Sequence, residues 1–95
     1  MDILAYIIPE NLTPLESDRK EHTWLGSKNI NGDYIFILTT TTYSEHHADQ
    51  YYKWFVNDLG ETIYVKPHTY FLMTKENFER DRIQGKKLLS NNKDE

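Results

Sequence analysis

The stretch G-D-Y-I-F-I-L-T-T-T-T-Y, from Gly32 to Tyr43, contains the longest run of β-forming residues in the chain. Alternate residues of a strand point to opposite faces. Up to Leu38 both faces are apolar, because the aromatic and leucine side chains fall on one face and two isoleucines on the other. We therefore expect a central strand that is covered on both sides. The next four residues are all threonines, which keep strand geometry and bring hydroxyl groups to both faces.

Five further segments are rich in β-branched or aromatic residues and are bounded by turn residues, which predicts five more strands. They are residues 2–8, 22–25, 51–56, 62–65 and 69–73. The Asn31-Gly32 pair predicts a hairpin between the second segment and the central strand. Pro9 is expected to end the first strand, and Lys66-Pro67 to separate the last two, because proline offers no N–H to a sheet.

One helix is expected near the C-terminus, over residues 75–84, with Thr74 as its N-cap and Gly85 as its end. Residues 11–21 predict a polar loop, with a short helix over residues 13–20 as the alternative. Short strands followed by one helix indicate a mainly β (α+β) fold. The sheet would be either a small antiparallel barrel or a strongly curved sheet.

The length of 95 residues allows one hydrophobic core and not two. We assign residues 1–89 to a single globular domain, with a last short strand or helical turn at Leu88 and Leu89. The polar end S-N-N-K-D-E, residues 90–95, predicts a disordered tail. Hydrophobic residues make up only 38% of the chain, so its 14% of aromatic residues must supply much of the buried area.

Composition and termini narrow the range of functions. The net charge of −4 argues against a broad nucleic-acid-binding surface, although it allows a local basic site. The chain has no cysteine, hence no disulfide framework and no thiolate chemistry. The N-terminus lacks the pattern of a signal peptide, and no apolar run approaches the ~20 residues of a membrane span. We therefore expect a cytoplasmic protein that is not inserted in a membrane.

The strongest candidate for chemistry is the segment R-K-E-H, residues 19–22, together with the threonines of the central strand. Counting back from the Asn31-Gly32 turn pairs Leu25 with Ile37 or Leu38 and sets His22 opposite Thr40 or Thr41. A cation, an imidazole and hydroxyl groups would then converge at one end of the hairpin. Such a set can hold a phosphate and move a proton, as RNA cleavage through the 2′-hydroxyl requires. The alternative is a solvated charged loop beside threonines that are only good strand formers.

Other polar and aromatic clusters give weaker signals. Glu45, His46, His47 and Asp49 include metal-ligand types, but neighbouring side chains diverge in an extended segment, so a solvated loop is expected rather than a metal site. The aromatic residues of the later strands could stack nucleobases, although the wall of a barrel is their more common role. The chain has no P-loop, no G-x-S-x-G, no G-x-G-x-x-G and no CxxC, and we expect no cofactor.

The order of these pieces resembles the MazF/PemK-like toxin family. The matching segments are R-K-E-H-T-W-L (19–25), F-I-L-T-T-T-T (36–42), T-I-Y-V-K-P-H-T-Y-F-L-M-T-K-E-N-F (62–78) and I-Q-G-K-K-L-L (83–89). This chain lacks the family's usual arginine followed by proline, and Arg19 and Lys20 stand near that place instead. The resemblance implies an SH3-like barrel, a homodimer, and cleavage of single-stranded RNA by metal-independent acid/base chemistry.

Three functions remain open. A ribonuclease toxin of a toxin–antitoxin pair would use Arg19 or Lys20 to stabilise the phosphate, His22 as acid or base, and Thr41 or Thr42 to position the scissile group. Its protein partner would be the antitoxin. A small acidic inhibitor or adaptor from a phage or mobile element would instead bind a host protein through its many tyrosines. A small-ligand or nucleotide-binding barrel is the third. The ribonuclease is the function that we expect first.

Overall fold

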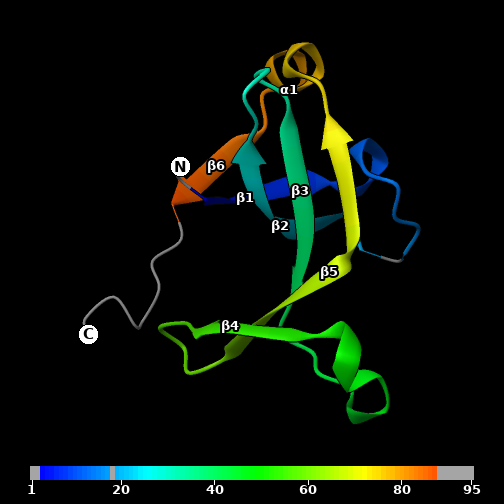
Figure 1. The fold of residues 1–95 in the computed structure, drawn as a ribbon, viewed down its shortest axis with the longest axis vertical. Helices are drawn as coiled ribbons and strands as arrows, with labels where there is room; N and C mark the ends of the chain where they lie inside the picture. The colour runs from blue at the N-terminus through cyan, green and yellow to red at the C-terminus, as the bar shows by residue number, and fades with distance from the viewer. Residues whose placement is uncertain (1–2, 18, 88–95) are drawn as a thin grey trace.

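The central strand β3 (Tyr34–Thr40) lies in the middle of a six-stranded antiparallel sheet of order β4-β5-β3-β2-β1-β6 (Figure 1). The computed structural model describes residues 3–17 and 19–87. The other strands are β1 (Leu4–Pro9), β2 (Glu21–Lys28), β4 (Tyr52–Val56), β5 (Thr62–Met73) and β6 (Gln84–Lys87). The edge strands β4 and β6 do not pair with each other, so the sheet is not closed. The predicted mainly β fold with one C-terminal helix is confirmed, as an open sheet and not a closed barrel.

The hairpin between β2 and β3 forms where the Asn31-Gly32 pair predicts it. Gly32 has a φ of +90°, a conformation that favours glycine, and its N–H donates to the carbonyl of Asn29 at 3.0 Å. The Asn29 side chain accepts hydrogen bonds from the backbone N–H groups of Asn31 and Asp33. The resulting register pairs Leu25 with Ile37, as expected from counting back from the turn.

The prediction that Lys66-Pro67 separates two strands is wrong, because β5 runs through both residues. The register between β3 and β5 shifts at this point: Ile37 pairs with Tyr70, but Leu38 pairs with Lys66. The three intervening residues of β5 therefore form a bulge that has no partners on β3. Pro67 is tolerated there because a bulged residue need not donate to the ladder.

The helix α1 (Lys75–Asp81) is shorter than predicted. Its N-cap is Thr74, as expected, whose hydroxyl accepts a hydrogen bond from the N–H of Asn77 at 3.2 Å. The helix ends at Arg82, which has a left-handed φ of 52°, and the chain then forms β6. Gly85 is consequently a strand residue opposite Tyr6 and not the end of the helix. The predicted last element at residues 88–89 and the predicted tail at 90–95 lie outside the described residues.

The segments between strands contain two short 3₁₀ helices, η1 (Glu10–Leu12) and η2 (Glu45–Gln50). The helix considered over residues 13–20 is absent from the described part of that segment, which is irregular after η1. Leu12 and Leu15 pack from this loop against the core, which explains why so polar a loop stays on the sheet. The described residues contain no helix with the length and apolar character needed to cross a membrane.

The core lies on one face of the sheet, which we call the inner face, and aromatic rings dominate it. Trp24 and Phe36 are fully buried, and the Tyr6 ring meets Phe36 edge-on with centroids 5.2 Å apart. Phe78 of α1 stacks on Tyr34 at 3.8 Å and so covers one end of this face. Aromatic pairs of this kind contribute about 0.5–1.5 kcal/mol each beyond the area that they bury. The aromatic residues therefore supply the core that the few aliphatic residues cannot.

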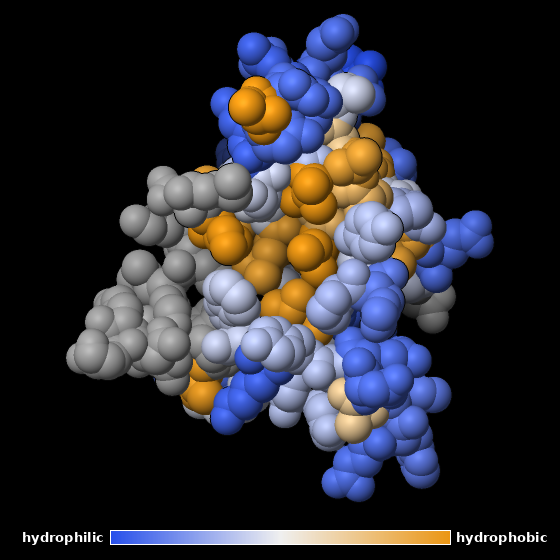
Figure 2. All heavy atoms as spheres, viewed as in Figure 1, coloured by the Kyte–Doolittle hydropathy of each residue, from blue (hydrophilic) through white to orange (hydrophobic). Residues whose placement is uncertain are grey.

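The opposite, outer face is partly open, so the prediction that β3 is covered on both sides is wrong. Ile35 is 37% exposed and pairs with Leu72, which is 67% exposed; Tyr70, opposite Ile37, is 60% exposed. Figure 2 shows the apolar side chains gathered in the middle of the molecule, framed by polar ones. β3 therefore carries apolar side chains on both faces, although only its inner face is fully packed.

Gly26 is the position at which this packing leaves least room. A Cβ atom there would lie 2.5 Å from the Tyr6 ring and 2.6 Å from the Phe36 ring, well inside van der Waals contact. We expect Gly26→Ala to lower the free energy of unfolding by about 1–3 kcal/mol, the usual cost of overpacking. Urea unfolding measures the change. Ile30→Ala, at a side chain that is 99% exposed, serves as the control and should change the stability by less than about 0.5 kcal/mol. Equal stability of the two variants would contradict this description of the core.

Candidate functional site

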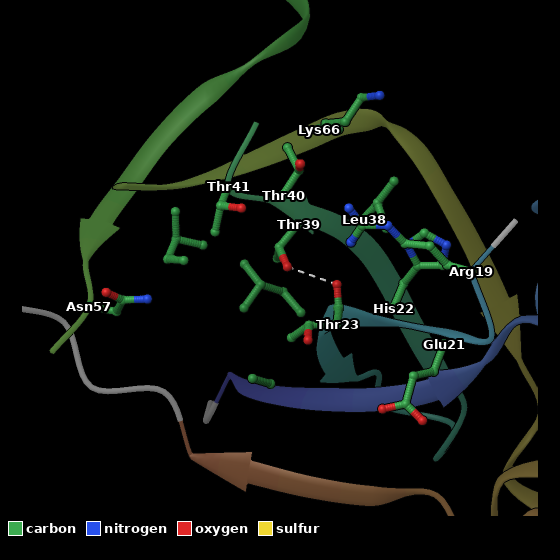
Figure 3. Close-up of a pocket in the computed structure, with 13 residues that line it drawn as sticks. Arg19, Glu21, His22, Thr23, Leu38, Thr39, Thr40, Thr41, Asn57 and Lys66 are labelled. Atoms are coloured by element: carbon green, nitrogen blue, oxygen red, sulfur yellow. Dashed lines mark hydrogen bonds between the residues drawn. The ribbon is translucent and has the colours of Figure 1, made fainter. Parts of the chain in front are cut away.

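A hollow of about 550 Å³ opens at the end of the β2–β3 hairpin that is remote from the turn. Its lining combines an apolar floor with cations, hydroxyl groups and one imidazole. The lining residues are Ala5, Arg19, Glu21, His22, Thr23, Leu25, Leu38, Thr39, Thr40, Thr41, Asn57, Ile63 and Lys66. In the view of Figure 3, Arg19 and His22 lie at one end and Thr41 and Asn57 at the other. Because neighbouring strand residues face opposite ways, the hollow wraps around the end of β3.

The strand register builds one row of side chains on the inner face beside this hollow. Trp24 pairs with Leu38, so continuing the same register by two residues brings His22 opposite Thr40. Thr40 in turn pairs with Tyr64 of β5. Residues directly opposite each other in an antiparallel sheet share a face. An imidazole, a hydroxyl and a phenol therefore share one face of β2, β3 and β5.

The His22 ring is held from the loop that follows β1. Its Nε2 atom lies 3.2 Å from Oε1 of Glu10 and 3.2 Å from Oγ of Ser17. The Ser17 hydroxyl itself donates to Glu10. Since a carboxylate can only accept, the hydrogen of a neutral His22 ring is assigned to Nε2. Nδ1 is then the ring nitrogen whose lone pair can take a proton, and Glu10 fixes both tautomer and orientation.

Two cations line the hollow. Arg19 comes from the loop before β2, where its N–H donates to Oγ of Ser17 at 3.2 Å. Lys66 comes from β5, next to the bulge and opposite Leu38. Glu21 is the single carboxylate of the lining. The hollow is therefore locally basic although the whole chain has a net charge of −4, and it can attract an anionic group.

The threonines have different positions and partners. The Thr39 hydroxyl donates to the carbonyl of Thr23 at 2.8 Å and ties β3 to β2. Oγ1 of Thr40 accepts from the N–H of Thr42 at 3.0 Å, which leaves the hydroxyl proton of Thr40 to be donated elsewhere. Thr41 is exposed and lines the hollow. The structure thus makes Thr40 the hydroxyl in register with His22.

Of the five predicted site residues, three line the hollow, though not all at the same end of it (Figure 3), and two do not. Arg19, His22 and Thr41 line the hollow. Lys20 and Thr42 are exposed and are not among the lining residues. The carbonyl of Lys20 accepts the N–H of Glu10 at 2.9 Å, so the backbone of Lys20 ties the loop after β1 to the start of β2.

Sequence reasoning missed the roles of Glu10, Ser17 and Lys66. It did not pair β1 with β2, and that pairing sets Pro9 opposite Glu21 and so brings Glu10 next to the start of β2. The register shift that sets Lys66 opposite Leu38 has no sequence signal other than Pro67. The available signal for Glu10 was its place directly after a strand-ending proline.

The polar cluster of Glu45, His46, His47 and Asp49 does not form a metal site. His46 and His47 lie exposed in η2. Within residues 3–17 and 19–87, no three histidine, aspartate or glutamate side chains come together in a way that could hold a metal ion.

Comparison of the chain with protein-family models, with curated proteins and with solved structures gives no match.

The contacts of Glu10 generate a prediction about pH. The pKa of Glu10 lies below its ordinary value of 4.5, chiefly because the Ser17 hydroxyl and the Ser17 N–H, the latter at 2.7 Å, bind the carboxylate, with His22 adding to the effect. We expect Ser17→Ala to raise the pKa of Glu10 in an NMR titration of the carboxyl carbon. His22→Ala should raise it less. An unchanged Glu10 pKa in Ser17→Ala would contradict the arrangement.

The same contacts affect stability. A carboxyl whose pKa is lowered by folding stabilises the folded state above its ordinary pKa. That contribution is lost as the pH falls from 4.5 through the lowered value. We expect Glu10→Gln to reduce the dependence of urea-unfolding stability on pH in this acid range and to leave a constant deficit above it. A dependence identical to that of the wild type would show that Glu10 is not held in this way.

Proposed function

We propose that the protein is an endoribonuclease that cuts single-stranded RNA, of the kind that acts as a toxin in toxin–antitoxin pairs. The observation that carries the proposal is His22, fixed by Glu10 and Ser17 at the edge of a locally basic hollow. A histidine positioned by a carboxylate is suited to general acid/base catalysis near neutral pH. The order of segments that resembles MazF/PemK-like toxins supports the same activity.

The proposed reaction begins with a proton transfer from the RNA 2′-hydroxyl to Nδ1 of His22. The 2′-oxygen then forms a bond to the neighbouring phosphorus, and the bond from phosphorus to the 5′-oxygen of the next nucleotide breaks. The leaving 5′-oxygen takes a proton from solvent or from the protonated His22. The products are a 2′,3′-cyclic phosphate and a 5′-hydroxyl.

The remaining polar groups would act on the phosphate. Arg19 and Lys66 supply positive charge where the extra negative charge of the transition state develops. The Thr40 hydroxyl, which accepts a hydrogen bond from Thr42, is left with a proton to donate to a phosphate oxygen. Three donors around one anion give both binding and stabilisation of charge.

Single-residue variants test the catalytic roles on single-stranded RNA. His22→Ala removes the general base and should cleave RNA about 10²–10⁴-fold more slowly than the wild type. Arg19→Ala removes one of the two cations proposed to bind the phosphate and should cleave RNA about 10²–10³-fold more slowly than the wild type. The matched controls are His46→Ala, at an exposed position of η2, and Arg80→Ala, on the exposed side of α1, and both should cleave like the wild type.

Intact RNA with the wild-type protein would overturn the ribonuclease. Equal rates for His22→Ala and His46→Ala would overturn the role of His22. The thermal unfolding temperature of each variant separates loss of activity from loss of the folded state.

A second function, an adaptor that binds a host protein, is favoured by the outer face of β3 and β5. Ile35, Tyr70 and Leu72 are exposed there on adjacent strands. Exposed apolar side chains gathered on one face are typical of protein-binding surfaces. Because the chain has a net charge of −4, the fitting partner is a protein with an apolar patch in basic surroundings.

Purified protein and the variant Leu72→Ser test this adaptor. A basic host protein should bind the wild type, more weakly at high salt, and should bind Leu72→Ser at least about 10-fold less tightly, as for a central interface residue. Ile30→Ser, at an exposed residue of the hairpin turn, is the control and should bind normally. Binding that Leu72→Ser leaves unchanged, or sedimentation showing that a second copy of the chain occupies this face, would contradict the adaptor.

A further inference from the structure

Three tyrosines from three separate segments form a cluster at one end of the sheet. Tyr43 follows β3, Tyr51 follows η2 and Tyr64 belongs to β5. The Tyr43 ring stacks on Tyr64 with centroids 4.9 Å apart and an interplanar angle of 30°. The Tyr51 ring lies 5.4 Å from Tyr43 and meets Tyr64 edge-on at 6.1 Å. Unlike the rings of the core, Tyr43 is 43% exposed.

The tyrosine cluster is joined to the catalytic hollow in two ways. Tyr64 is opposite Thr40 in the sheet and so continues the row that begins at His22. The Nζ atom of Lys66 lies 5.5 Å above the centroid of the Tyr51 ring, while Lys66 also lines the hollow. A cation in this position is attracted by the ring and stays beside it. One lysine therefore lies at the boundary between the polar hollow and an aromatic surface.

This combination fits a nucleotide. In single-stranded RNA a base is attached through one sugar to each phosphate, so an aromatic surface beside a phosphate site can meet the adjoining base. Aromatic rings bind unpaired bases by stacking with any base, because every base has a π-face. A duplex would hide its bases from such a surface. The aromatic neighbour thus favours single strands over double strands.

We propose that Tyr43, Tyr51 and Tyr64 form a base-stacking subsite that holds a nucleobase next to the phosphate bound by Arg19 and Lys66. Tyr43 provides the exposed ring, and Tyr64 stacks against that ring. Tyr51 holds the Lys66 ammonium group next to the cluster. The subsite rests on the proposed ribonuclease function and adds to it the mode of binding: selection of unpaired RNA by shape, with little preference for base identity. The same three rings also hold η2 against β5, so its test must separate stacking from folding.

Binding of a short fluorescent 2′-O-methyl RNA tests the subsite, because this RNA has no 2′-hydroxyl to react and remains intact. Tyr43→Leu keeps an apolar side chain and removes the ring. We expect it to weaken binding by about 10-fold or more, as loss of a stacked base does. Tyr43→Phe keeps the ring and should bind within about 2-fold of the wild type, since stacking does not need the hydroxyl. The same RNA made without bases, as a sugar–phosphate chain, should bind equally to Tyr43→Leu and wild type.

Tyr52→Leu is the matched control, because Tyr52 is 65% exposed on β4 and lies outside the cluster. It should bind RNA like the wild type, and thermal unfolding should show that all variants are folded. If Tyr43→Leu binds normally while Arg19→Ala binds weakly, the subsite is wrong and the ribonuclease proposal stands. Equal loss in Tyr43→Leu and Tyr43→Phe would also overturn stacking. If the wild type binds no RNA, both proposals fail.

Discussion

The ring of Tyr6 lies against two glycines, Gly26 of β2 and Gly85 of β6, and the rest of the sheet depends on this contact. A Cβ atom at either glycine would overlap the ring, which therefore covers backbone on both sides of β1. Phe36 and Phe78 pack edge-on against the same ring and connect β3 and α1 to it. One aromatic side chain thus holds together the strands on either side of β1, the central strand and the helix. That is how a chain with few aliphatic residues forms a core.

This core also places the candidate site. Pairing of β1 with β2 brings the loop after Pro9 beside the start of β2, and that loop carries Glu10 and Ser17 to His22. Leu12 and Leu15 anchor the loop on the core, so the polar contacts are supported by apolar ones. The bulge around Pro67 then sets Lys66 opposite Leu38. The site is consequently built from the ends of strands whose positions are determined by packing elsewhere.

Local sequence signals predicted the parts of the fold that local interactions determine. The Asn31-Gly32 turn predicted the β2–β3 hairpin and its register, and Thr74 predicted the helix start, because turns and caps act through neighbouring residues. The misjudged features depend on distant partners. Gly85 looked like a helix end, but it is a strand residue because Tyr6 covers it. Glu10 and Lys66 belong to the site because β1 pairs with β2 and β5 pairs with β3. The periodicity of residues along the chain does not reveal such pairings. The same limit applies to the open outer face, whose apolar residues look like core in the sequence.

In our proposal, a positioned imidazole, two cations and an aromatic neighbour serve one reaction, the cleavage of RNA through its own 2′-hydroxyl. The most direct measurement is mass spectrometry of the fragments after purified protein is incubated with single-stranded RNA. Our proposal predicts fragments that end in a 2′,3′-cyclic phosphate and fragments that begin with a 5′-hydroxyl, both formed about 10²–10⁴-fold more slowly with His22→Ala. Intact RNA with the wild type, or fragments with a 3′-hydroxyl and a 5′-phosphate, would contradict it.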